Sequence, residues 1–139
     1  MLQRIQTVYL LIITILGGLA CWFQMDFFLA FTKEITGVSS MIMPVFALAL
    51  ILIPVFALIA IFLFKKRNLQ IKFIWIAIIF IVIYYLITFY IRIKLQLDVK
   101  LALSHFSIIF NLINLILCNL AITAIKKDEK LVRSLDRIR

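Results

Sequence analysis

The side chains of this chain that could carry out acid–base or metal chemistry are few and scattered. His105 is the only histidine, and Cys21 and Cys118 are the only cysteines. One histidine cannot provide bis-histidine haem ligation, and a zinc site of histidine and cysteine ligands needs a closer set than these. The cysteines form no C-x-x-C pair, so disulfide exchange is not expected. We therefore predict a protein that is not an enzyme and that uses no metal or cofactor.

The remaining polar side chains of the apolar segments are neutral. Five of them fall at similar depth in the third and fourth segments, and these are Tyr84, Tyr85, Thr88, Asn111 and Asn114. Amides and hydroxyls in lipid seek hydrogen-bond partners and hold neighbouring helices together. One interpretation is that the third segment hydrogen-bonds to the fourth. The alternative is a small polar pocket for a ligand such as a quinone or a lipid headgroup.

Four long apolar segments position these residues, and none of the four contains a charged side chain. They cover residues 5–23, 41–64, 73–91 and 105–125, and a helix that crosses a bilayer needs roughly 20 residues. The chain is 66% hydrophobic, which is more than a soluble domain of this size could bury. A lone strand in lipid would leave its backbone unpaired. The 139 residues therefore predict one all-α integral membrane domain, an up-down bundle of four transmembrane helices.

The distribution of basic residues predicts how the bundle is oriented. Eleven of the 15 Lys and Arg residues lie at the N-terminus, in the second loop or after the fourth segment. Because cytoplasmic loops carry an excess of Lys and Arg, this places both termini in the cytoplasm. The net charge of +9 is confined to loops and tails. We expect contact with membrane lipid, including anionic headgroups, and none with nucleic acid.

The tail, residues 126–139, has the pattern of a basic amphipathic helix that continues the fourth segment. Its apolar residues Leu131, Leu135 and Ile138 recur at helical spacing. Such a helix can lie on the headgroups or bind a protein, and its mixture of acidic with basic residues favours a protein surface. The residues expected to make either contact are Lys126, Lys127, Lys130, Leu131, Arg133, Leu135, Arg137, Ile138 and Arg139.

A stripe of small residues runs along the first segment. Thr7, Thr14 and Cys21 repeat every seven residues, and Gly18 lies one turn beyond Thr14. Small residues on one face let two helices approach closely. We expect this seam to pack against another segment of the chain or against another subunit.

The second segment and the third loop each depart from a simple helical pattern. Pro54 has no N–H, which should free the carbonyl of Leu50 and kink the helix. In the third loop, residues 91–101 alternate apolar and polar side chains, which is typical of a half-buried strand. A lone strand is unstable, so it would lie on the headgroups, pair with the first loop or pair with a neighbouring protein.

Both ends of the chain resemble a known family. The segments are QRIQTVYLL over 3–11 and AIKKDEKLVRSLDRIR over 124–139. They resemble a family of small four-span bacterial inner-membrane proteins that is catalogued as a domain of unknown function. This resemblance implies four helices in a bacterial cytoplasmic membrane, and it implies no activity, cofactor or catalytic residue.

No group of reactive residues is evident, and the tail and the third loop are possible docking surfaces. Together these two observations favour a structural role. We expect a non-enzymatic accessory or scaffold subunit of a larger bacterial inner-membrane complex, of secretion or respiratory type, that docks on other membrane-protein subunits through its helices and basic tail. The alternative is a small homo-oligomeric transporter or lipid-handling protein. It would use the neutral polar residues of the third and fourth segments as a pocket and Pro54 as a hinge.

Overall fold

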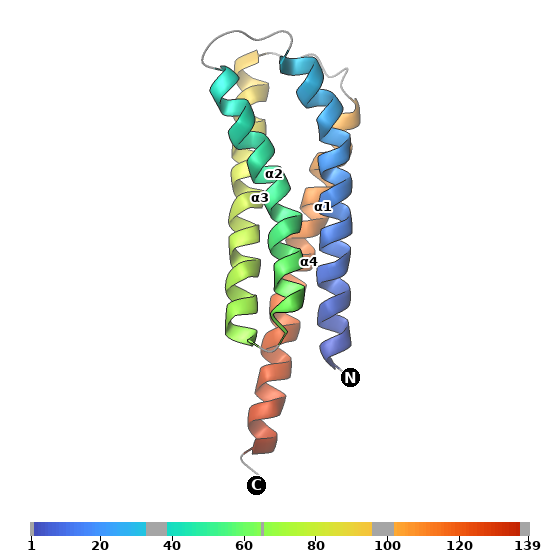
Figure 1. Cartoon of the computed structure of the whole chain (residues 1–139), viewed down its shortest axis with the longest axis vertical. Coiled ribbons are helices and arrows are strands. Elements are labelled where there is room, and N and C mark those ends of the chain that lie inside the picture. The colour runs from blue at the N-terminus through green and yellow to red at the C-terminus, as the bar shows by residue number, and fades with distance from the viewer. Residues whose placement is uncertain (1, 33–38, 65, 96–101, 137–139) are drawn as a thin grey trace.

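The chain folds as an antiparallel bundle of four helices in this computed structural model (Figure 1). The structure describes residues 2–32, 39–64, 66–95 and 102–136, with side chains placed for 5–24, 44–64, 66–90, 93, 106–132 and 134. The helices are α1 (Leu2–Thr32), α2 (Ser39–Phe62), α3 (Arg67–Leu95) and α4 (Ala102–Asp136). Each contains a stretch that is long and apolar enough to cross a membrane. The prediction of an all-α membrane protein with four transmembrane helices is confirmed.

The helices pack in a closed ring, in the order α1, α2, α3, α4 and back to α1. The contact of α1 with α4 is the most extensive, and that of α3 with α4 is the least. α1 begins and α4 ends at the same end of the bundle (Figure 1), which we call the Gln6 end. The opposite end is called the Gln24 end.

Residues that face the bundle interior recur at alternating spacings of four and three in every helix. On α1 they are Gln6, Leu10, Ile13, Gly17, Ala20 and Gln24. On α4 they are Ser107, Asn111, Asn114, Cys118, Ala121, Ile125 and Asp128. On α2 they are Phe46, Leu50, Ile53, Ala57 and Ala60. On α3 they are Gln70, Ile74, Ala77, Ile81 and Tyr84. This spacing is that of antiparallel bundles with knobs-into-holes packing.

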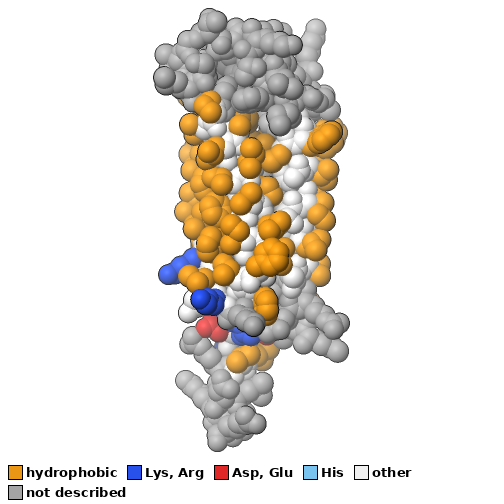
Figure 2. All heavy atoms as spheres, in the orientation of Figure 1, with side chains coloured by type: hydrophobic (Ala, Val, Ile, Leu, Met, Phe, Trp, Pro, Cys, Tyr) orange, Lys and Arg blue, Asp and Glu red, His pale blue; other side chains and the backbone are white. Residues whose placement is uncertain are grey.

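The outward faces of the helices are as apolar as the interior. Val8, Ile15, Leu86 and Ile116 are each more than half exposed. Figure 2 shows apolar side chains covering the bundle between its ends, with Lys and Arg side chains at the Gln6 end. A continuous apolar surface of this kind is stable in lipid and not in water.

The expected strand of the third loop is wrong where the structure describes it. α3 continues to Leu95, so residues 91–95 are helical, and residues 96–101 lie outside the described part of the chain. A helix pairs its backbone N–H and C=O groups within one segment, whereas a single strand needs a partner. Helix therefore prevails over the alternating side-chain pattern.

The tail is helical, as the sequence predicts. α4 continues without interruption from the bundle to Asp136, and residues 137–139 lie outside the described residues. Residues 129–136, which we call the overhang, add about 12 Å of helix at 1.5 Å per residue. Figure 1 shows this part of α4 extending past the ends of the neighbouring helices.

Candidate functional site

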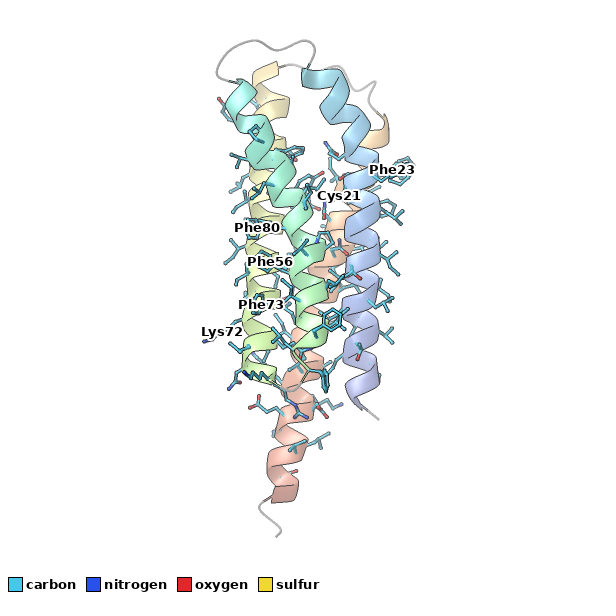
Figure 3. The ribbon with its side chains drawn as sticks, viewed as in Figure 1. Cys21, Phe23, Phe56, Lys72, Phe73 and Phe80 are labelled. Atoms are coloured by element: carbon cyan, nitrogen blue, oxygen red, sulfur yellow. The ribbon has the colours of Figure 1, made fainter. Side chains whose placement is uncertain are left out.

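Pro54 lies at the contact between α1 and α2. Because proline has no N–H, the Leu50 carbonyl lacks its usual helical donor. The Cys21 thiol on α1 lies 3.5 Å from that carbonyl oxygen and donates to it, and Figure 3 shows Cys21 between the two helices. A Cβ added at Gly17, one turn earlier, would lie only 3.1 Å from the Pro54 Cβ. Pro54 thus frees the Leu50 carbonyl to accept from α1, and its ring packs closely against α1. The kink predicted at Pro54 stays a prediction.

The predicted small-residue seam does not form the inner face of α1. Thr7 and Gly18 face outward, and the Thr14 hydroxyl donates to the Leu11 carbonyl of its own helix at 2.7 Å. Nothing in the described part of the chain lies within 4 Å of a Cβ added at Gly18. Of the seam residues, Cys21 bonds to the backbone of α2. The others lie on the surface that lipid or another subunit would cover.

Two tyrosines of α3 hydrogen-bond to α4. The Tyr84 and Ser107 hydroxyls are 3.0 Å apart and fully buried, and the Tyr85 hydroxyl donates to the Ile108 carbonyl at 2.8 Å. Thr88 instead donates to the Tyr84 carbonyl of its own helix at 2.8 Å. The hydrogen bonding expected between the third and fourth segments is therefore present through the tyrosines. The ring of Phe46 on α2 stacks on Tyr84, with centroids 5.3 Å apart.

Asn111 and Asn114 behave differently from the tyrosines. Both side chains are fully buried, and among the described residues neither amide nitrogen nor either carbonyl oxygen has a hydrogen-bond partner. Asn119, on the outward face of the same helix, donates to the Leu115 carbonyl at 2.9 Å. A buried polar group without a partner costs about 1–3 kcal/mol. The sequence therefore identified the asparagines as polar interior residues, but the structure gives them no partner on α3.

A set of polar residues continues from the asparagines toward the Gln24 end. Phe23 on α1 contacts Phe106 and Phe110, with ring centroids 5.8 and 5.9 Å apart, so its neighbour Gln24 lies at the level of Ser107. Gln24 is buried, and its Oε1 has no partner among the described residues. We define the polar column as Gln24, Tyr84, Ser107, Asn111 and Asn114. It spans about 10 Å along α4 from Ser107 to Asn114.

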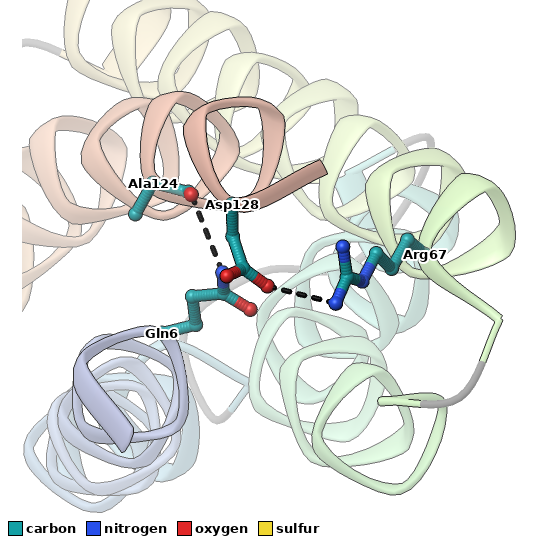
Figure 4. A network of polar contacts seen from close by, with 4 residues as sticks. All are labelled: Gln6, Arg67, Ala124 and Asp128. Atoms are coloured by element: carbon teal, nitrogen blue, oxygen red, sulfur yellow. Dashed lines mark hydrogen bonds and ion pairs between the residues drawn. The ribbon is translucent and has the colours of Figure 1, made fainter. Parts of the chain in front are cut away.

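A second polar group closes the Gln6 end (Figure 4). Arg67 Nη2 lies 2.9 Å from Asp128 Oδ2. The Arg67 N–H does not point at this oxygen closely enough to form a hydrogen bond, so attraction between opposite charges holds the pair. The Gln6 amide nitrogen donates to the Ala124 carbonyl at 3.3 Å. These contacts tie the start of α1 and the start of α3 to the last buried turn of α4.

Sequence reasoning missed Gln6, Gln70 and the pair of Arg67 with Asp128, as it missed Gln24 and Ser107. Their sequence positions could have identified them as interior residues, because each lies three or four residues from interior residues of its own helix. Gln6 precedes Leu10 and Ile13, for example, and Asp128 follows Ile125. Gln70 completes the group at this end, and its Oε1 has no partner among the described residues.

The residues predicted for partner or headgroup contact are exposed where the structure describes them. Lys126, Lys127 and Lys130 are exposed, and Leu131 and Val132 are 43% and 40% exposed. The side chains of Arg133 and Leu135 lie outside the described set, as do Arg137, Ile138 and Arg139. The overhang therefore presents apolar side chains beside basic ones.

The described polar side chains between α3 and α4 offer hydrogen bonding. Within the described ranges, no three His, Cys, Asp or Glu side chains come together as metal ligands. Cys118 is buried, Cys21 is half-buried, and both are free thiols.

Comparison with known proteins gives one result. No curated protein and no solved structure matches this chain significantly. The family described as "Domain of unknown function (DUF4293)" matches residues 2–138, which is nearly the whole of the 139-residue chain. The chain therefore belongs to the DUF4293 family.

Proposed function

We propose that this protein is a non-enzymatic accessory or scaffold subunit of a larger bacterial inner-membrane complex, of secretion or respiratory type. The observation that carries the proposal is the overhang. It leaves the bundle as a straight continuation of α4 (Figure 1), and it exposes Leu131 and Val132. Because α4 contains a stretch long and apolar enough to cross a membrane, its straight continuation follows the axis of that span. A helix that served only as a lipid anchor would lie in the plane of the headgroups.

The chemistry of the overhang favours a protein partner. Within the overhang, exposed Lys130 adjoins Leu131 and Val132, and exposed Lys126 and Lys127 come just before it on the same helix. This combination fits another membrane-protein subunit that presents an apolar groove with acidic residues at its rim, since apolar contact and opposite charge together set a partner's position. The outward apolar faces of the four helices add a surface for contacts within the bilayer.

The same proposal includes an orientation with both termini in the cytoplasm. It rests on the excess of Lys and Arg at the ends and in the second loop. A single cysteine added after Arg139, in a chain with Cys21→Ala and Cys118→Ala, should resist an impermeant thiol reagent added to intact cells. Labelling of that cysteine before the cells are opened would place the tail outside and remove the cytoplasmic docking role.

The docking role is tested with a photocrosslinking residue at position 132 in intact cells. We expect a crosslink to one membrane protein, and we expect Leu131→Ser to reduce its yield without lowering the amount of this chain. Gentle extraction should then give a native mass above that of the 16.2 kDa chain by a fixed number of partner subunits. A lone monomer or a plain homodimer would contradict the proposal.

A second candidate function is favoured by the unpartnered amides of Asn111 and Asn114. In it, the chain is a small homo-oligomeric transporter or lipid-handling protein with a neutral polar pocket between α3 and α4. The variant Asn111→Leu plus Asn114→Leu should then fail to complement a deletion strain while its expression stays unchanged. Full complementation by this variant would exclude the second candidate and leave the first intact.

A further inference from the structure

The polar column contains more hydrogen-bonding capacity than the protein itself satisfies. Each carboxamide of Asn111 and Asn114 offers two donors and an acceptor oxygen. Both side chains are fully buried, and among the described residues none bonds to them. The nearest polar groups on the column are engaged already, because Tyr84 and Ser107 bond to each other.

Small side chains of α1 and α3 face the asparagines. Gln6 pairs with Ala124 and Phe23 with Phe106 and Phe110, so the antiparallel register sets Ala20 of α1 opposite Asn111. The contacts of α3 with α4 likewise set Ala77 close to the level of Asn114. Both alanines are buried, and each contributes one methyl group to the interior.

The interior next to the asparagines is polar toward the Gln24 end and apolar toward the Gln6 end. Gln24, whose Oε1 is also unpartnered among the described residues, lies at its outer limit. Beyond Asn114, the next interior residues of α4 are Cys118, Ala121 and Ile125. These belong to a buried cluster with Leu10 and Ile13 of α1. The unpartnered amides therefore lie on the Gln24 side of this apolar cluster.

We propose that the polar column is a hydrated site in which water molecules bridge Asn111 and Asn114 and extend toward Gln24. Water is the ligand because the column carries no charged group among its five side chains and because a buried water needs two to four polar partners, which the donors and acceptors of the two amides provide. The apolar cluster bounds this site on the side of the Gln6 end. This inference does not depend on the docking role of the overhang, and it concerns the same two asparagines as the second candidate function.

Proton-detected NMR of the full chain, labelled with nitrogen-15 in lipid nanodiscs, tests the proposal. We expect cross peaks between water and the side-chain amides of Asn111 and Asn114. Asn119 is the control, since it lies on the outward face and bonds to its own helix. Its amide should show a water cross peak at least several-fold weaker. The variants Asn111→Leu, Asn114→Leu and Asn119→Leu assign the signals.

The outcomes separate clearly. Water contacts at Asn111 and Asn114 that exceed those at Asn119 support the hydrated site, and Asn111→Leu should then weaken the water contact of Asn114. Folded protein whose two interior amides show no water contact would overturn it, because the amides would then bond to protein. Equal water contact at all three asparagines would also overturn it, because hydration would not be specific to the column.

Discussion

At the scale of single residues, the polar side chains of the described spans mark the two ends of the bundle interior. Gln6, Gln70 and Asp128 are buried at one end, and Gln24 and Ser107 at the other. Gln6 and Gln24 are separated along α1 by about 27 Å of helix, close to the thickness of the hydrocarbon layer of roughly 30 Å. Asn111 and Asn114 are the exception, because they lie inside that thickness and have no partner among the described residues.

The ion pair at the Gln6 end gives the first prediction. Asp128→Asn removes the charge that faces Arg67 at 2.9 Å and leaves a partly buried guanidinium without its counter-ion. We expect a loss of roughly 1–3 kcal/mol in the free energy of unfolding, measured by chemical denaturation in detergent. Lys126→Gln, on an exposed position of the same helix, should leave stability unchanged. If Arg67→Gln plus Asp128→Asn is as unstable as the sum of the two single variants, the residues do not act as a pair.

The thiol of Cys21 gives the second prediction. It donates to the Leu50 carbonyl, so its S–H stretching band should lie at lower frequency than that of Cys118 in the infrared spectrum. The variants Cys21→Ala and Cys118→Ala assign the two bands. Pro54→Ala restores a backbone N–H that competes for the same carbonyl, and the Cys21 band should then move to higher frequency. An unchanged band in Pro54→Ala would show that proline does not create the acceptor.

At the scale of helices, the sequence predicts four spans and the helical tail because length and composition alone determine them. It does not predict which face of each helix is inside, because lipid-facing residues such as Leu86 and interior residues such as Ile81 are equally apolar. The hydrophobic pattern of such a helix therefore does not distinguish its lipid-facing side from its interior side. For this reason the sequence does not distinguish Gly18, which faces outward, from Gly17, which packs inward. The polar residues at spacings of four and three would have identified the inner faces of α1, α3 and α4, but α2 has no polar residue among its described inner positions.

The two adjacent glycines give the third prediction, with a control in the chain itself. Gly17→Ala places a methyl group 3.1 Å from the Pro54 Cβ, so α1 and α2 must separate slightly. Overpacking of this kind costs about 1–3 kcal/mol. Gly18→Ala meets nothing within 4 Å among the described residues and should be neutral or stabilising by up to about 1 kcal/mol, because alanine favours helix. Thermal unfolding followed by circular dichroism compares the two. Equal melting temperatures would contradict the close contact of Gly17 with Pro54.

At the scale of the whole molecule, the bundle and the overhang are separate in structural terms. The closed ring of helices buries its core between the Gln6 and Gln24 ends. Among the side chains of α4 that the structure describes, Asp128 is the last buried one. The residues that follow it add exposed surface, including Leu131 and Val132. The fold therefore does not require the overhang, which is why we assign the docking role to it.

Truncation provides the fourth prediction. A chain that ends at Lys130 keeps Ala124 and the Arg67–Asp128 pair, so its melting temperature should stay within a few degrees of that of the full chain, while the native mass of the assembly falls to that of the chain alone. A chain that ends at Thr123 loses Ile125 from the core, together with both polar contacts at the Gln6 end, and should not reach the membrane as folded protein. If the Lys130 truncation still purifies with its partner at unchanged stoichiometry, the lipid-facing helices carry the assembly and the overhang does not. If that truncation unfolds, α4 beyond Asp128 belongs to the fold, and its exposed apolar residues would no longer indicate a partner.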